Sequence, residues 1–284
     1  MELTSPKTIK EILTQHDAKA NKTLGQNFLT DKNVLQKIIE ASEIKKTDTI
    51  LEVGPGIGTL TQQLASRAGE VVAIEKDPAM CKILSETMAE FKNVTVVQDD
   101  ILHNTKDLIH NTNYKVVANI PYYLTSPLIR KFLELNPSAG GPPEFMVLMI
   151  QKEVAQRICA KPPKLNLLAV SVQFYAEPKI MSYVSKNSFF PAPKIDSAII
   201  KITPKNIIEK NNSDLFFKVV KAGFSHPRKQ LLGNLVGELK IKKETAQNWL
   251  LQNNIKPTQR AETLSVEQWV QLAMNYELCI TKYE

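Results

Sequence analysis

Apolar residues along the chain follow two spacings, and each spacing predicts a different kind of element. Short and nearly continuous apolar runs predict buried strands, whereas apolar residues at every third or fourth position predict helices. Between residues 49 and 150 the two patterns alternate, which indicates a parallel sheet covered by helices on both faces. The expected strands are Thr49–Val53, Val71–Ile74, Val94–Val97, Lys115–Ala118 and Phe145–Ile150, and the expected helices are Leu60–Ala68, Asp77–Phe91 and Ser126–Leu135.

Helical patterns flank this alternation on both sides. On the N-terminal side, a short polar helix over residues 5–18 is followed by a basic loop, Lys19–Leu29, and then by a helix that Asp31 can cap. On the C-terminal side the pattern is mixed at first and then entirely helical. The expected elements there are a helix at Lys152–Cys159, strands near Leu168–Tyr175 and at Ser197–Ile202, and helices at Leu215–Ala222, Lys229–Leu239, Lys243–Leu251 and Val266–Glu277.

The change from a mixed to an all-helical pattern falls near Pro204, where a polar stretch begins. We therefore divide the chain into an N-terminal extension over residues 1–30, an α/β domain over residues 31–204 and a smaller all-helical domain over residues 205–284. A chain of 284 residues is long enough for one large domain and one small domain.

Basic residues are concentrated in the second part of the chain. Lys and Arg exceed Asp and Glu by 7 over the whole sequence, and the segment Lys194–Arg260 alone, with 13 basic and 5 acidic residues, has a balance of +8. A basic segment beside a nearly neutral one suggests a polyanionic partner that contacts mainly the C-terminal part. On charge alone, a solvated lysine-rich surface is an equally good interpretation.

The composition argues against several other classes of protein. No run of 18 apolar residues predicts a membrane span, and the first six residues lack the basic flank and apolar core of a secretory signal, so we expect a cytoplasmic protein without a membrane partner. Cys81, Cys159 and Cys279 lie far apart without metal-ligand spacing, and no two histidines are four residues apart. We expect no metal site, and we interpret the cysteines as small buried apolar groups.

A glycine-rich loop follows the first strand of the alternation. The sequence Gly54-Pro55-Gly56-Ile57-Gly58 leads from this strand into the next helix. Gly54 and Gly56 permit backbone torsions and a close approach to a ligand that side chains would block. Glu75 ends the second strand, where a carboxylate can accept hydrogen bonds from both hydroxyls of a ribose lying across the carboxyl ends of the strands.

Nicotinamide dinucleotide enzymes share this arrangement, but two details favour S-adenosylmethionine as the cofactor. A dinucleotide-binding loop would have its third glycine at the position of Thr59. In addition, Asp100 follows the third strand, where an acidic residue can accept a hydrogen bond from an adenine amino group. Asp99 is an alternative for this role, and Gln98-Asp99-Asp100 is also compatible with a simple polar strand exit.

The tetrapeptide Asn119-Ile120-Pro121-Tyr122 directly follows the fourth strand. An adenine amino group is a poor nucleophile because its lone pair is delocalised into the ring, so a site must hold both amino hydrogens with acceptors. The Asn119 oxygen can be one acceptor and a backbone carbonyl in the Ile120–Pro121 stretch the other, with Pro121 biasing the preceding residue to extended geometry. Tyr122 can stack on the base, which contributes roughly 1–3 kcal/mol. A simple turn is the alternative.

Several motifs occur in a fixed order: Asn27-Phe28-Leu29, Glu52–Gly58, Glu75, Asp100, Asn119–Tyr122, Phe189 and Pro191–Ser197. Together they resemble the ribosomal RNA adenine N6,N6-dimethyltransferases, and Gln151–Arg157 is similar to the bacterial 16S branch, the KsgA family, rather than to the 23S branch. The resemblance spans roughly residues 20–235. It implies a class I S-adenosylmethionine-dependent methyltransferase fold, Rossmann-like with a mostly parallel seven-stranded sheet over residues 31–204, and an RNA-binding helical domain over residues 205–284.

The resemblance also implies a substrate. Family members dimethylate the N6 amino groups of two adjacent adenosines in the 3′-terminal hairpin loop of 16S rRNA during small-subunit biogenesis, so we expect 16S rRNA in the small subunit or its precursor as the partner. Unpaired loop bases can be splayed into a pocket at low cost. We expect a monomer that needs no metal.

The roles implied by the resemblance fall into three groups. Residues 1–30 would end in a loop that contacts cofactor and RNA. Without the family, two adjacent aromatics before a Pro-x-Pro turn favour one core and one surface position, and base stacking by Phe189 is the less favoured alternative. Cofactor binding, with S-adenosylhomocysteine as product, is implied for Asn27, Leu29, Gly54, Gly56, Glu75, Asp100 and Asn119, catalysis for Asn119, Pro121, Tyr122 and Phe189, which would face Tyr122 across the base, and RNA binding for Arg228 and Lys229.

Two departures from the family pattern concern RNA docking. Leu165-Asn166 stands where Tyr-Gly is usual, and Pro227-Arg228-Lys229 supplies two of three usual charges. Three other functions stay open: a 23S rRNA adenine N6-methyltransferase, a non-catalytic ribosome-assembly or nucleic-acid-binding factor, and a small-molecule methyltransferase. The intact tetrapeptide and glycine loop argue against the second, because a binder needs neither. The basic segment argues against the third.

Overall fold

The structure, a computed structural model, describes residues 1–21, 25–103, 113–135, 141–205 and 213–276. Its backbone contacts divide the chain into two compact units. The second unit includes a segment, residues 156–176, that the sequence had assigned to the α/β domain. Unit 1 comprises Met1–Ala155 and Glu177–Pro204, and unit 2 comprises Gln156–Ala176 and Lys205–Glu284.

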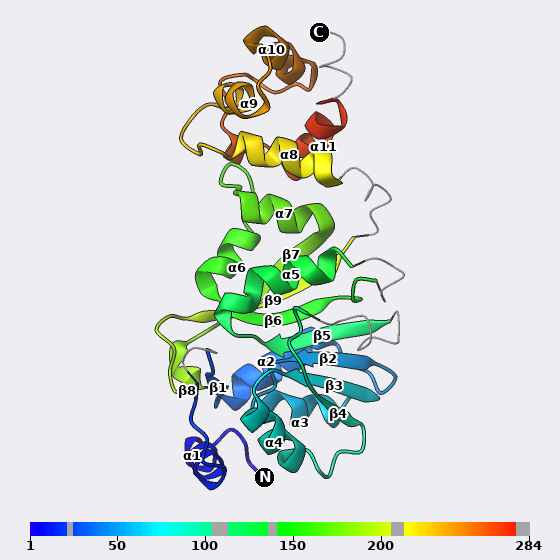
Figure 1. The fold of residues 1–284 in the computed structure, drawn as a ribbon, viewed down its shortest axis with the longest axis vertical. Helices are drawn as coiled ribbons and strands as arrows, with labels where there is room; N and C mark the ends of the chain where they lie inside the picture. The colour runs from blue at the N-terminus through cyan, green and yellow to red at the C-terminus, as the bar shows by residue number, and fades with distance from the viewer. Residues whose placement is uncertain (22–24, 104–112, 136–140, 206–212, 277–284) are drawn as a thin grey trace. The chain divides into compact units, whose positions relative to one another are not determined.

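Unit 1 is built on a seven-stranded sheet with the strand order β4-β3-β2-β5-β6-β9-β7 (Figure 1). Strands β2 to β6 pair in parallel, and β9 pairs antiparallel with β6. The mostly parallel seven-stranded sheet expected from the sequence is therefore confirmed. The strands are β2 Thr49–Val53, β3 Glu70–Glu75, β4 Val94–Gln98, β5 Tyr114–Asn119, β6 Met146–Gln151, β7 Ala176–Val184 and β9 Ser197–Pro204.

Helices cover both faces of this sheet. The apolar sides of α2 and α3 pack with Val71 of β3, and those of α1 and α4 pack with Ala73. Residues two apart in a strand point to the same face, so these helices share one side of the sheet. Phe132 of α5 lies 6.4 Å from the ring of Tyr114, on the opposite side. The helices are α1 Pro6–Gln15, α2 Lys32–Ser42, α3 Thr59–Ala65, α4 Pro78–Thr87, η1 Tyr122–Leu124 and α5 Thr125–Leu133.

Capping residues fix where these helices begin. The Asp31 side chain accepts hydrogen bonds from the backbone N–H groups of Asn33 and Val34, as the sequence predicted for the start of α2. Asp77 accepts from the N–H of Ala79 at the start of α4, and Pro78 occupies the first turn, where a missing N–H does no harm. The Asp77 cap thereby fixes where the chain turns into α4 after the carboxyl end of β3.

The apolar run near residues 168–175 is a helix, so the predicted strand is wrong. Asn166 caps α7, Leu167–Tyr175, by accepting the N–H of Ala169 at 3.1 Å. A short, mostly apolar run fits a buried strand and a buried helix equally well. Phe174 of α7 stacks on Phe216 at 4.0 Å, which explains why this segment belongs to unit 2.

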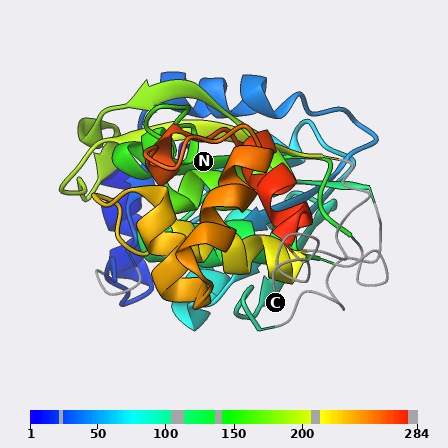
Figure 2. The same cartoon turned by 90° about the horizontal axis from the view of Figure 1, so that it is seen from above.

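Unit 2 is helical, as expected, with α8 Ser213–Gly223, α9 Leu231–Leu239, α10 Lys243–Gln252, η5 Ala261–Thr263 and α11 Val266–Met274. Figure 2 shows these helices, coloured yellow to red, gathered side by side. Trp249 and Trp269 are fully buried between them. The predicted helix end at Glu277 lies outside the described residues. The short helix α6, Lys152–Ile158, spans the junction of the two units.

Among the residues that the structure describes, no helix combines the length and apolar character needed to cross a membrane.

Candidate functional site

A cavity of about 200 Å³ opens at the carboxyl ends of the central strands of unit 1. The residues predicted for cofactor binding and catalysis come from separate parts of the sequence, yet all of them line this one cavity: Asn27, Leu29, Gly54, Gly56, Glu75, Asp100, Asn119, Pro121, Tyr122 and Phe189. Arg228 and Lys229 are not among its lining residues. They are exposed in the turn between α8 and α9 of unit 2.

A two-stranded ladder closes one side of the cavity. Strand β1, Phe28–Leu29, pairs antiparallel with β8, Phe189–Phe190, with Leu29 opposite Phe189. Phe189 is only 6% exposed and packs in the same core cluster as Leu29. The sequence left Phe189 open between a core and a ligand-facing position, and the structure places it in the core and on the cavity wall.

The glycine loop after β2 uses torsions that favour glycine. Gly54 has φ +68° and Gly56 has φ +58°, both in the left-handed region. A Cβ atom at Gly56 would lie 3.2 Å from Cε1 of Phe28, a tight contact that the phenyl ring would have to relieve by shifting. The loop therefore passes the cavity with bare backbone and leaves its space to a ligand.

Glu75 is buried beside this loop at the end of β3. Its Oε2 accepts the N–H of Gly56 at 3.1 Å, and its Oε1 accepts the N–H of Asp77 at 2.9 Å. Burial raises the pKa of Glu75, and the N–H donors oppose that rise. Each carboxylate oxygen accepts more than one hydrogen bond, so both can still receive a ligand hydroxyl.

Asp100 lies on the far side of the cavity after β4. Its Oδ2 forms an ion pair with Nζ of Lys76 at 2.8 Å, and its Oδ1 accepts the N–H of Leu102 at 2.9 Å. Burial alone would raise the pKa of Asp100, but these two hydrogen bonds together lower it, so the group is an ionised acceptor at neutral pH. Asp99, the alternative considered from the sequence, also lines the cavity, and its Oδ1 accepts the N–H of Asp100.

Asn119 ends β5 and is oriented by a backbone group. Its Nδ2 donates to the carbonyl of Asn27 at 3.2 Å, which leaves the side-chain oxygen as the acceptor. The carbonyl of Pro121 accepts the N–H of Leu124 at 2.9 Å. Of the two carbonyls that the sequence left open as a second acceptor, the one of Ile120 is therefore the better candidate.

Tyr122 is half-buried, and its hydroxyl shares a hydrogen bond of 2.8 Å with Oγ of Ser197 at the start of β9. Burial raises the pKa of Tyr122, so the phenol stays neutral. This bond ties the ring to the antiparallel end of the sheet. The sequence contained no signal for the pairing, because the two residues are far apart along the chain.

Glu52 is a cavity-lining residue to which the sequence assigned no role. Its side chain is 1% exposed, and its Oε2 has no hydrogen-bond partner within the described part of the chain. Burial raises the pKa of Glu52 to about 8. Its position in a strand next to a glycine loop is visible in the sequence, but its complete burial is seen only in the folded chain.

The predicted independence from a metal stays a prediction. No three His, Cys, Asp or Glu side chains come together as a possible metal site in the ranges that the structure covers. Cys81 is a buried free thiol, and burial raises its pKa to about 11.

The chain is similar to known proteins over nearly its whole length. Residues 17–277 match the family profile described as ribosomal RNA adenine dimethylase. Ribosomal RNA small subunit methyltransferase A of Dehalococcoides mccartyi is 44% identical over 271 residues, which cover 94% of this chain and 92% of the relative. The protein of the same name from Alkaliphilus oremlandii is 41% identical, covering 96% of this chain and 97% of the relative.

Two solved structures share the fold. A dimethyladenosine transferase from Plasmodium falciparum superposes with a TM-score of 0.74 at 26% identity, covering 88% of this chain and 98% of the other. The 23S rRNA methyltransferase ErmE superposes with a TM-score of 0.72 at 26% identity, covering 88% and 100%.

Proposed function

We propose the function of this chain from one premise: it belongs to the ribosomal RNA adenine dimethylase family. It is an S-adenosylmethionine-dependent rRNA methyltransferase that dimethylates the N6 amino groups of two adjacent adenosines in the 3′-terminal hairpin loop of 16S rRNA during small-subunit biogenesis. The observation that supports this most strongly is the single cavity lined by every residue predicted for cofactor binding and catalysis.

The cavity wall fits S-adenosylmethionine, which when bound supplies an electrophilic methyl group on a sulfonium. The bare backbone at Gly54 and Gly56 admits a close ligand, and the buried carboxylate of Glu75 offers acceptors for two ribose hydroxyls. The ionised Asp100 is an acceptor for an adenine amino group. The remaining cofactor contacts are proposed for Asn27, Leu29 and Asn119.

For the first methyl transfer, the chain activates the target amine by holding both of its hydrogens. The oxygen of Asn119 accepts one, and the carbonyl of Ile120 accepts the other, which favours a pyramidal nitrogen with its lone pair directed outward. Pro121 keeps Ile120 extended and so fixes the direction of that carbonyl. An amide is not a base, so Asn119 positions and polarises the amine, and the proton leaves to water once the nitrogen is cationic.

Two aromatic side chains hold the target base. Tyr122 stacks on one face, with its hydroxyl anchored on Ser197, and Phe189 packs on the other. A base clamped between two rings keeps its amino group in the plane that the acceptors require. Because Phe189 belongs to the core cluster of the sheet, its ring is held by the surrounding packing.

The small subunit is the proposed target. The curated relatives named above carry small-subunit names, and the identity to them exceeds that to the 23S enzyme. In this proposal residues 31–204 carry out methyl transfer, residues 205–284 bind RNA with Arg228 and Lys229, and residues 1–30 end in a loop that contacts both ligands. The protein acts in the cytoplasm as a monomer and without a metal.

Methylation of purified subunits tests this function. The chain is incubated with labelled S-adenosylmethionine and with small or large subunits from cells that lack the modification, and the digested rRNA is analysed by mass spectrometry. We expect N6,N6-dimethyladenosine in small subunits only. Label in large subunits would support the 23S alternative. Cofactor binding without label in either subunit would support the non-catalytic factor.

A further inference from the structure

An exposed tyrosine lies on the wall of the cavity and has no part in the proposed methyl transfer. Tyr123 follows Tyr122 in η1, but the two rings differ in their surroundings. Tyr122 is half-buried and hydrogen-bonded to Ser197, whereas Tyr123 is 56% exposed while still lining the cavity. The second ring therefore sits where the cavity meets solvent.

Lys76 lies at the same opening. It directly follows Glu75, lines the cavity, and has a side chain that is 59% exposed. The pKa of Lys76 is raised, chiefly by its hydrogen bond with Asp100. Lys76 and Tyr123 line the same cavity. An ammonium has three donors, so Lys76 can keep Asp100 and still receive another anion.

A flat aromatic ring beside a cation is the combination that binds a nucleotide of single-stranded RNA, with the base stacked on the ring and the phosphate near the charge. We propose that Tyr123 and Lys76 bind the nucleotide adjacent to the target adenosine. Tyr123 stacks on the base of that nucleotide, and Lys76 approaches its phosphate. The inference rests on the proposed function, in which the substrate has two adjacent adenosines.

The order of the two tyrosines in the chain supports this assignment. With one base held at Tyr122 inside the cavity, the RNA backbone has to leave through the opening, and the next base along meets the next ring. For either target adenosine, Tyr123 would then stack on the nucleotide that follows it in the direction of the opening. Tyr123 is therefore a positioning residue, and it favours an adjacent nucleotide whose base stacks well on its ring.

The substitution Tyr123→Leu tests the proposal, because it keeps apolar bulk and removes the aromatic face. Small subunits lacking the modification serve as substrate, and the KM for subunits, kcat and the affinity for S-adenosylmethionine are measured. We expect the KM for subunits to rise roughly 5- to 150-fold, the range that corresponds to the loss of one stacked base. Tyr123→Phe should behave as the parent chain does, and cofactor affinity should stay unchanged in both variants.

Tyr183 provides a matched control. It is 53% exposed and has Lys152 over its ring at 5.4 Å, but it is not among the cavity-lining residues, so Tyr183→Leu should leave the KM for subunits unchanged. Lys76→Gln should lower the slope of log affinity against log salt by about one unit. Two results for Tyr123→Leu would overturn the proposal: an unchanged KM for subunits, or a loss of cofactor affinity in that variant equal to its loss of subunit affinity. A parent chain that methylates neither subunit would instead overturn the proposed function.

Discussion

At the scale of single residues, the orientation of Asn119 is set by one backbone carbonyl. Its Nδ2 donates to Asn27 at 3.2 Å, so the amide cannot turn over without losing that bond. The side-chain oxygen is thereby kept as an acceptor, which is what its proposed role toward the target amine requires. An aspartate at this position would lack the donor and would face the Asn27 carbonyl with a second oxygen.

Asn119→Ala should therefore remove catalysis while leaving substrate binding nearly intact. Losing one positioned hydrogen-bond partner of a reacting group lowers turnover by roughly 10²–10³-fold in other enzymes. We expect a loss of this size in single-turnover methylation of small subunits, with RNA affinity close to normal. Asn119→Asp, which keeps the size and loses the donor, should be impaired as well. Equal losses of binding and turnover would contradict the assigned role.

A second prediction at this scale concerns Glu52. Burial, with a smaller contribution from Glu75, raises the pKa of Glu52 to about 8. Between the ordinary pKa and this value the folded state holds a proton that the unfolded state has released. The free energy of unfolding should therefore fall as pH rises through this window, by up to about 1.4 kcal/mol per pH unit.

Glu52→Gln should flatten this dependence, because the amide does not titrate. Urea unfolding of the cofactor-free protein at pH 5.5, 6.5 and 7.5 measures the slope. Glu90→Gln, a change at an exposed position, is the control and should keep the slope of the parent chain. If Glu52→Gln and the parent chain show the same slope, Glu52 is ionised in the folded protein.

The sequence identified the residues that line the cavity better than it identified their partners. Motif order located Glu75, Asp100 and Asn119 in one cavity, because the carboxyl ends of parallel strands share one edge of the sheet. It did not reveal the hydrogen bond between Tyr122 and Ser197 or the burial of Glu52. Those depend on elements that meet only in the folded chain.

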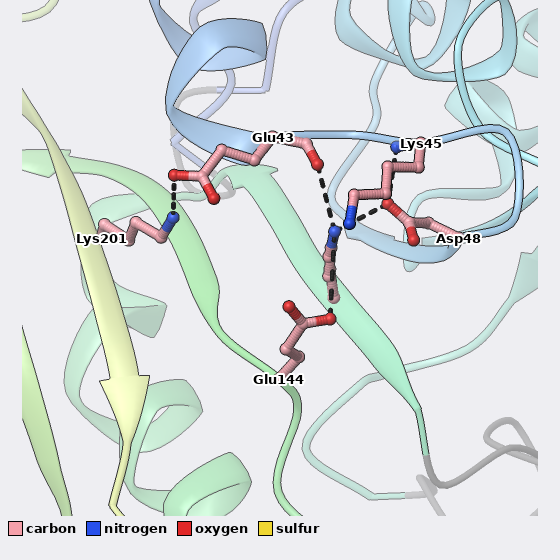
Figure 3. A network of polar contacts seen from close by, with 6 residues as sticks. Glu43, Lys45, Asp48, Glu144 and Lys201 are labelled. Carbon is pink, nitrogen blue, oxygen red and sulfur yellow. Dashed lines mark hydrogen bonds and ion pairs between the residues drawn. The ribbon is translucent and has the colours of Figure 1, made fainter.

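At the scale of elements, a polar network joins the ends of several strands away from the cavity (Figure 3). Lys115 of β5 has a side chain that is only 4% exposed, and its Nζ contacts Asp48 at 2.7 Å, the Glu43 carbonyl at 3.2 Å and Glu144 at 3.9 Å. Lys201 of β9 pairs with the Glu43 carboxylate at 2.7 Å. The network connects the end of α2 to β2, β5, β6 and β9.

Lys115→Met should destabilise unit 1, because it leaves Asp48 without its buried cation. Breaking a buried ion pair by removing one partner costs roughly 3–5 kcal/mol. We expect a loss of that order in urea unfolding at pH 7. Lys201→Met is the matched control and should have a smaller effect, because its partner Glu43 has a side chain that is 67% exposed. Similar effects of the two substitutions would mean that burial of the network does not matter.

The ion pair between Lys115 and Asp48 also makes the stability of the folded protein depend on pH in the acidic range. Burial alone would raise the pKa of Asp48. Hydrogen bonds from Lys115 and from the backbone of Lys45 outweigh this effect and lower the pKa. The lowered pKa stabilises the folded protein above the ordinary pKa of an aspartate, and this stabilisation is lost as pH falls through the folded-state value. Lys115→Met should therefore lose much of the difference in stability between pH 7 and acidic pH.

The elements also show where periodicity stops being informative. Thr49–Val53 was predicted with its observed bounds, because a strand that lies between two turn signals can begin and end at only a few positions. The run 168–175 was assigned as a strand and is α7, because a short, mostly apolar run is compatible with both elements. Strand β7, which follows α7 directly, was missed for a different reason: it is an edge strand whose side chains are mostly exposed or half-buried, so no apolar run marks it.

At the scale of the whole molecule, the chain separates its chemistry from its basic segment. Every cavity-lining residue belongs to unit 1, and Arg228 and Lys229 belong to unit 2. Composition alone suggested this division, since the excess of positive charge falls in residues 194–260. It did not reveal that residues 156–176 join the helical unit, because that depends on contacts such as the one between Phe174 and Phe216.

Joint substitution of Arg228 and Lys229 by alanine should weaken RNA binding and leave cofactor binding intact. If each side chain contacts a phosphate, the slope of log affinity against log salt should fall by about two units. Binding of small subunits at several salt concentrations measures it. Lys7→Ala, an exposed change in α1, is a control for the loss of a surface charge. An unchanged slope would remove both residues from the RNA interface.

In the proposed function, the cavity of unit 1, with Asn119 as an acceptor, makes an adenine amino group in small-subunit rRNA reactive toward S-adenosylmethionine. The most direct test of this role is mass spectrometry of adenosines in rRNA from a strain without this gene, compared with strains carrying the parent chain or Asn119→Ala. We predict N6,N6-dimethyladenosine in the 3′-terminal hairpin of 16S rRNA only when the parent chain is restored. Full dimethylation in the deletion strain, or its restoration by Asn119→Ala, would contradict the account.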